Sequence, residues 1–288
     1  MNAESDPFDR LRQILLNDGP AALLETLERS FREEGRHHER FEILKMQSRR
    51  ELGLPLLAAD RLENLDEAVR IELEDRLLEA CRDVGTALMA AGKLREGWMY
   101  LRPVGDRQAA ARFLTETTID ESNLDEVIEI AIGEGVAPAF GYRLILNEFG
   151  TCNSITAFET QIRQLPKPDQ QACAAMLIAH LHTELLRNLR DDIERRSEVR
   201  PTGDTLLELV ADRDWLFGEM SYHVDTTHLA SVVRFARVVE EPSTLRIAAD
   251  LTEYGRRLHE RFKYQGDEPF GELHEASRLF FRTLLGES

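Results

Sequence analysis

The 288-residue chain has few cysteines and no long apolar run, and these two features argue against a disulfide-stabilised fold and a membrane-spanning protein. Its three cysteines, Cys81, Cys152 and Cys173, are widely spaced and form no CxxC pair. A disulfide framework or a structural zinc site is therefore not expected, and a reducing compartment fits. No stretch approaches the roughly 18 apolar residues that span a bilayer. The polar, acidic N-terminus also lacks the apolar core of a secretory signal. We expect a soluble, cytoplasmic protein with no membrane partner.

Basic residues are also scarce: the chain has 36 lysines and arginines against 53 aspartates and glutamates, which gives a formal net charge of -17. A chain this acidic repels phosphate backbones, so we expect no nucleic-acid partner. The short pairs Arg49-Arg50, Arg195-Arg196 and Arg256-Arg257 lie among mixed charges, which is typical of solvated helix faces. The chain has no Walker loop and no GxGxxG, GxSxG or HExxH motif, so no cofactor is expected.

Strand signals are missing as well, and the apolar residues recur at helical spacing almost throughout, as at Phe8, Leu11 and Leu15. The apolar run Val127–Ile132 follows Asn123 and Glu126, a capping-box variant that favours helix over strand. We therefore predict an all-α fold without β-sheet, built from about ten to fifteen helices stacked as antiparallel hairpins. The polar stretch SEVRPTGD predicts a boundary between a helical-repeat region, 1–198, and a C-terminal helical region, 199–288. One continuous domain is the alternative.

One hairpin carries a family resemblance. In DVGTALMAAGKLREGWMYLRPV, Asp83–Val104, small residues stand at Gly85 and Ala87, a turn glycine at Gly92 and another small residue at Gly97. This segment resembles a tetratricopeptide repeat, although Cys81 holds the usual aromatic position and Val104 the late alanine. The resemblance implies a right-handed array of helical hairpins that binds a protein or peptide. Small residues at the crossing would let the two helix backbones approach closely.

The segment HLHTE, His180–Glu184, offers a first candidate site. Residues two apart on a helix point in nearly opposite directions, so His180 and His182 form no metal pair. His180 and Glu184 share a strip, beside the apolar arc of Leu177, Leu181, Leu185 and Leu189. This pair is either a functional site or a histidine bonded to its own carboxylate at the edge of a buried face.

The segment SYHVDTTHL, Ser221–Leu229, offers a second. Asp225 is a favoured N-cap for a helix starting at Thr226, which places His228 at the third helical position. His223 then precedes the cap and is free in direction. A carboxylate beside an imidazole would orient it for acid–base chemistry or metal binding. The alternative is a cap with two half-buried rings.

Cys152 is the third candidate, because Gly150 is expected to close one helix and Thr151 or Asn153 to cap the next. A thiol at a helix N-terminus is a stronger nucleophile, but it would need His223 or His228 as a base. A cysteine in a helix–helix turn is the alternative.

Two functions follow from these patterns. The first is a helical-repeat interaction scaffold that binds a peptide or protein partner, with no metal expected. The second is a metal-dependent or cysteine/histidine hydrolase. Its site would combine His180 and Glu184 with His223, Asp225 and His228, through antiparallel packing of neighbouring helices.

Overall fold

The computed structural model describes residues 6–57, 65–266, 269 and 271–287, and these residues form helices and turns with no strand. The predicted all-α fold is thereby confirmed. The chain divides into two compact units, Met1–Ile130 (unit 1) and Ala131–Ser288 (unit 2). No helix of the described ranges is long and apolar enough to cross a membrane.

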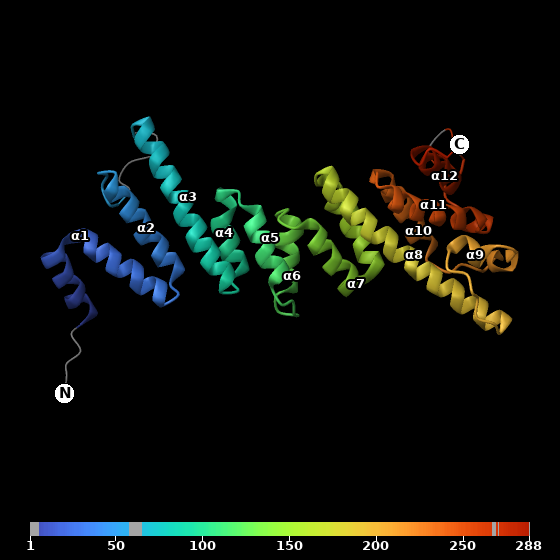
Figure 1. Cartoon of the computed structure of the whole chain (residues 1–288), viewed down its shortest axis with the longest axis horizontal. Helices are drawn as coiled ribbons and strands as arrows, with labels where there is room; N and C mark the ends of the chain where they lie inside the picture. Colours follow the sequence, from blue (N-terminus) through green and yellow to red (C-terminus); the bar gives the residue numbers. More distant parts are fainter. Residues whose placement is uncertain (1–5, 58–64, 267–268, 270, 288) are drawn as a thin grey trace. The chain divides into compact units, whose positions relative to one another are not determined.

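Among the described residues, unit 1 contains six α-helices, and Figure 1 shows them following one another in chain order; a short π-helix, η2, spans the boundary with unit 2. Each of the first four packs on the next, while α5 contacts both α3 and α4 and α6 contacts α4. The helices are α1 (Pro7–Glu33), α2 (His37–Glu51), α3 (Glu67–Ala90), α4 (Leu94–Val104), α5 (Arg107–Glu116), α6 (Leu124–Ile128) and η2 (Glu129–Gly133). Contacts are therefore made mainly between neighbours in sequence, as in a stack.

The predicted hairpin is formed by α3 and α4, which turn at Gly92 with φ of +77°. Glycines face each other at the crossing: a Cβ on Gly97 would lie 2.9 Å from the carbonyl oxygen of Gly85. A Cβ on Gly85 would lie 3.0 Å from the carbonyl oxygen of Gly97. The expectation that small residues bring these two backbones together is confirmed.

A buried charge network ties the first three helices of unit 1 together. The Arg40 side chain on α2 donates to Glu28 on α1 at 2.7 Å, and also to Asp83 on α3 at 3.4 Å. Arg32 adds a second hydrogen bond to the same Glu28 oxygen at 2.6 Å. Glu28 and Arg40 are only 7% and 6% exposed, so each depends on the other to offset lost hydration.

The segment Val127–Ile132 is helical, as predicted, in α6 and η2. The predicted capping box at its start is wrong. The Asn123 side chain accepts from the amide of Asp120, and Glu126 accepts from the amide of Arg95. Tertiary and turn contacts thus take both groups away from the helix start.

Unit 2 is built around the long helix α8 (Lys167–Ser197), against which α7, α9, α10 and α11 pack. Its predicted apolar arc, Leu177, Leu181, Leu185 and Leu189, is fully buried. The other elements of unit 2 are α7 (Pro138–Thr160), η3 (Ile162–Gln164), α9 (Leu206–Val210), η4 (Asp214–Phe217), α10 (Thr226–Phe235), η5 (Ala236–Val238), α11 (Pro242–Arg257), η6 (Glu260–Phe262) and α12 (Leu273–Leu284).

The boundary predicted after residue 198 falls inside unit 2. The segment that follows α8 folds back onto it, since Arg190 donates to the carbonyls of Gly203 and Asp204, each at 3.3 Å. Contacts of α9 with α8 and α11 then join 199–288 to the same core. Polar composition and proline marked a turn between packed helices at this point.

Candidate functional site

The start of α10 has the predicted cap. An Asp225 side-chain oxygen accepts from the amides of Thr227 at 2.8 Å and His228 at 3.3 Å. The Thr227 hydroxyl also donates to this oxygen. The hydroxyl bond first, and then the two amide bonds, hold the pKa of Asp225 below its usual range. Asp225 therefore acts as a helix cap, and His228 lies at the third helical position as predicted.

His223, just before that cap, turns inward and joins a buried hydrogen-bond network. Its Nε2 lies 3.2 Å from Oδ2 of Asp192 on α8, and its Nδ1 lies 2.9 Å from the hydroxyl of Tyr254 on α11. The same hydroxyl accepts from the backbone amide of His223 at 3.0 Å. All three residues are at most 9% exposed. We call this the Asp192–His223–Tyr254 network.

The neutral imidazole satisfies every group in this network. Nε2–H donates to the Asp192 carboxylate, and the Tyr254 hydroxyl donates to Nδ1 while accepting the amide of His223. Burial lowers the pKa of His223, against an opposing effect of Asp192, which is consistent with the neutral form. Both ring nitrogens are thus occupied, and the network orders the loop before α10 instead of presenting a base to a substrate.

Asp192 is held from the opposite side by two arginines of its own helix. Arg195 and Arg196 both donate to Oδ1, the latter at 3.1 Å. Burial raises the pKa of Asp192, but hydrogen bonds from Arg195 and His223 outweigh that effect and leave the pKa lowered. The carboxylate is therefore ionised and fully engaged.

A cavity of about 400 Å³ opens beside the network. Its walls come from the last turns of α8 and from the loop before α10. The lining residues are Asn188, Asp191, Asp192, Arg195, Arg196, Met220, Ser221, Tyr222 and His223. Asn188 donates to the backbone carbonyl of His223 at 2.7 Å, so both walls are fixed to each other.

The other predicted residues lie elsewhere. His180 is exposed and Glu184 half-buried, and they precede Asp192 on α8 by twelve and eight residues, or about 18 and 12 Å along the helix. The structure therefore does not bring this pair to His223. Across the described ranges, no three His, Cys, Asp or Glu side chains are arranged to hold a metal ion.

Cys152 is free and exposed. Gly150, with φ of 75°, interrupts α7 two residues earlier, so the predicted helix break is present. Asn153 does not cap the second half, because its side-chain amide donates to the carbonyl of Phe149 at 2.8 Å. Cys152 makes no hydrogen bond to a histidine in the part of the chain that the structure describes.

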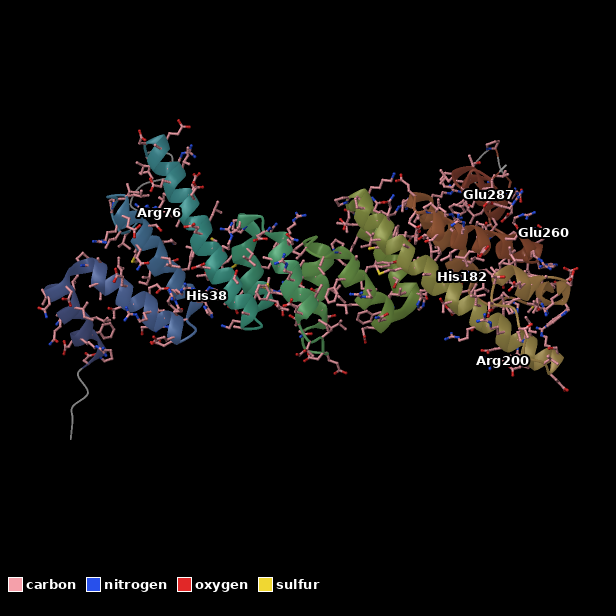
Figure 2. The ribbon with its side chains drawn as sticks, viewed as in Figure 1. His38, Arg76, His182, Arg200, Glu260 and Glu287 are labelled. Atoms are coloured by element: carbon pink, nitrogen blue, oxygen red, sulfur yellow. The ribbon has the colours of Figure 1, made fainter. Side chains whose placement is uncertain are left out.

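Sequence reasoning missed two partners in unit 2. Asp192 and Tyr254 lie 31 residues either side of His223, and no local pattern joins them. His182, labelled in Figure 2, is the half-buried histidine of the HLHTE segment, and its Nε2 lies 3.9 Å from Asp250 on α11. Burial lowers the pKa of His182 and raises that of Asp250, so both favour their neutral forms. The face of α8 that packs against the rest of unit 2 therefore extends from the predicted apolar arc toward His182.

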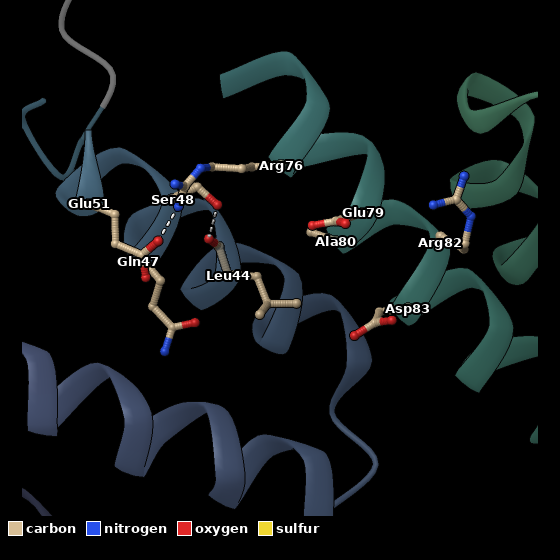
Figure 3. Close-up of a pocket in the computed structure, with 9 residues that line it drawn as sticks. All are labelled: Leu44, Gln47, Ser48, Glu51, Arg76, Glu79, Ala80, Arg82 and Asp83. Carbon is tan, nitrogen blue, oxygen red and sulfur yellow. Dashed lines mark hydrogen bonds and ion pairs between the residues drawn. The ribbon is translucent and has the colours of Figure 1, made fainter. Parts of the chain in front are cut away.

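Unit 1 has a cavity of its own, a groove of about 490 Å³ between α2 and α3 (Figure 3). It is lined by Leu44, Gln47, Ser48, Glu51, Arg76, Glu79, Ala80, Arg82 and Asp83. We call it the α2–α3 groove. An ion pair between Glu51 and Arg76 closes one end, and Asp83, bonded to Arg40, stands at the other. Between them, Leu44 and Ala80 supply a short apolar floor.

No family model matches the chain, and no curated protein or solved structure matches it either.

Proposed function

We propose that the protein is a helical-repeat interaction scaffold, resembling tetratricopeptide arrays, that binds a peptide or protein segment along the α2–α3 groove. The observation that carries the proposal is this groove, open between two helices of a sequentially packed stack. Stacked hairpins present continuous inter-helix grooves, and recognition of a chain segment is their common use.

The groove has the character of a recognition surface. Gln47 and Glu79 line its walls and make no side-chain hydrogen bond to another residue within the described ranges, so their polar groups are free for a partner. Leu44 and Ala80 can receive an apolar side chain between them. The Arg40–Asp83 and Glu51–Arg76 ion pairs join α2 to α3, so the groove exists before binding and little ordering is required.

The hydrolase alternative finds no comparable support. Its histidine and carboxylate candidates are distributed over α8 and the start of α10, and both ring nitrogens of His223 are occupied. A general base needs a free lone pair within reach of a substrate.

Site-specific photo-crosslinking tests the proposal. A photoreactive residue at Gln47 or Glu79 should give one discrete adduct in cells, whereas one at Glu42, on α2 outside the groove, should not. The captured protein would then be purified and its affinity measured. Gln47→Trp, which fills the groove, should weaken binding of this protein, and Glu42→Trp should not. Equal labelling from all three positions, or equal affinity of both variants, would refute the proposal.

A further inference from the structure

Unit 2 carries a second surface on which large apolar side chains are exposed. Of its large exposed apolar side chains, Val199, Leu207, Trp215, Met220 and Tyr222 all fall within one short stretch of the sequence. Met220 is 75% and Tyr222 55% exposed. Both line the cavity beside the Asp192–His223–Tyr254 network.

Arginines contact two of these side chains, Trp215 and Met220. The guanidinium of Arg196 lies 5.3 Å from the Trp215 ring centre, and Arg261 Nη1 lies 3.0 Å from the Met220 sulfur. Tyr222 meets Phe262 edge to face at 5.2 Å. Tryptophan, tyrosine, methionine and arginine are the residues enriched at protein interfaces and their energetic centres. We call this set the aromatic–arginine rim.

The charge of the cavity points to the chemistry of its ligand. Asp192 is buried and pairs with the inner side of the Arg195 and Arg196 guanidiniums, so its negative charge does not face the cavity opening. Arg195 remains 74% exposed, and its other N–H groups have no partner among the described residues. A guanidinium held in place with free donors is suited to a carboxylate, which it binds with two parallel hydrogen bonds.

We infer that this cavity binds a carboxylate of a partner peptide, with an adjacent aromatic or aliphatic side chain packed on the aromatic–arginine rim. The carboxylate meets Arg195, and the apolar neighbour covers Met220, Tyr222 and Trp215. Asp191 is the lining carboxylate that opposes such a ligand. The inference rests on the proposed scaffold function, but its site lies in unit 2 and is tested apart from the α2–α3 groove.

Three labelled peptides test the inference by fluorescence anisotropy with the full chain. The first has an amidated C-terminus and one Glu beside Leu-Trp. The second has Gln in place of that Glu. The third has the Gln and a free C-terminal carboxylate next to the Trp. The Glu peptide should bind about tenfold more tightly than its Gln counterpart. Tight binding of only the third would assign the site to a chain terminus.

Variants locate the binding. Arg195→Gln should abolish the preference for the Glu peptide over the Gln peptide, while Arg196 still holds Asp192. The control Arg187→Gln, on the same helix outside the cavity, should leave this preference unchanged. Asp191→Asn should strengthen binding of the Glu peptide. Met220→Ala should weaken all three peptides equally, and thermal melts would confirm that each variant is folded. Binding that ignores the carboxylate, an unchanged Arg195→Gln variant, or no binding by any peptide would overturn the inference.

Discussion

The contact between Gly85 and Gly97 gives the sharpest prediction about the fold of unit 1. In Gly97→Ala the new methyl group would lie 2.7 Å from Met89 Cγ and 2.9 Å from both the Gly85 carbonyl oxygen and the Met89 amide nitrogen. Two of these neighbours are backbone atoms, so α3 and α4 would have to move apart. Overpacking costs about 1–3 kcal/mol, and because two of the close neighbours are backbone atoms the cost here should lie in the upper part of that range, about 2–3 kcal/mol.

Helix propensity acts in the opposite direction. Alanine favours a helix over glycine by about 1 kcal/mol, so the net loss of unfolding free energy should be about 1–2 kcal/mol. For a unit of this size that corresponds to a fall in melting temperature of about 3–8 °C. Calorimetry or circular dichroism measures both quantities.

Gly271→Ala is the matched control. A Cβ there has no atom of the described residues within 4 Å, and its backbone is not left-handed, so the melting temperature should stay the same or rise slightly. A Gly97→Ala protein as stable as the unchanged chain would refute the close crossing of α3 and α4.

Three further predictions concern buried polar groups. Arg40→Ala should lower the unfolding free energy by about 3 kcal/mol in urea titrations, because Glu28 then keeps Arg32 as its one arginine partner. The double variant Glu28→Gln/Arg40→Met should recover part of this loss. Equal losses of unfolding free energy in the single and the double variant would contradict a buried pair. Tyr254→Phe should cost about 1–3 kcal/mol by the same method, since two groups of His223 lose their partner, and a neutral result would contradict the network. His274 is fully buried, and burial is the main reason that its pKa is lowered to about 4. Between about pH 6.5 and 4 the unfolded chain therefore binds more protons than the folded chain. The free energy of unfolding should fall as the pH drops through that window. His274→Leu should flatten this fall and raise the melting temperature at pH 7, because both ring nitrogens lack a hydrogen bond within the described residues.

Local patterns predicted most of the backbone. Helical periodicity, the Asp225 cap, the break at Gly150 and the small residues at the α3–α4 crossing were all predictable because each depends on residues close in sequence or in one hairpin. The exceptions are the caps expected from Asn123, whose side chain bonds within a neighbouring turn, and from Asn153, whose side chain bonds to the carbonyl of Phe149.

The candidate site could be predicted only in part. The sequence singled out His223, but its partners Asp192 and Tyr254 come from two other helices, and only tertiary packing selects them. His180 and His182 show the same limit. Both flank one apolar arc, and contact with α11 leaves His182 half-buried while His180 stays exposed.

The central claim is that a partner segment lies along the α2–α3 groove. Hydrogen exchange tests it most directly, measured on the complex of this protein with the partner that crosslinks to the photoreactive residue at position 47. Protection should appear in residues 44–51 and 76–83, and the exchange of α5 should stay as in the free chain. Protection confined to other helices, or none in either groove wall, would contradict the account.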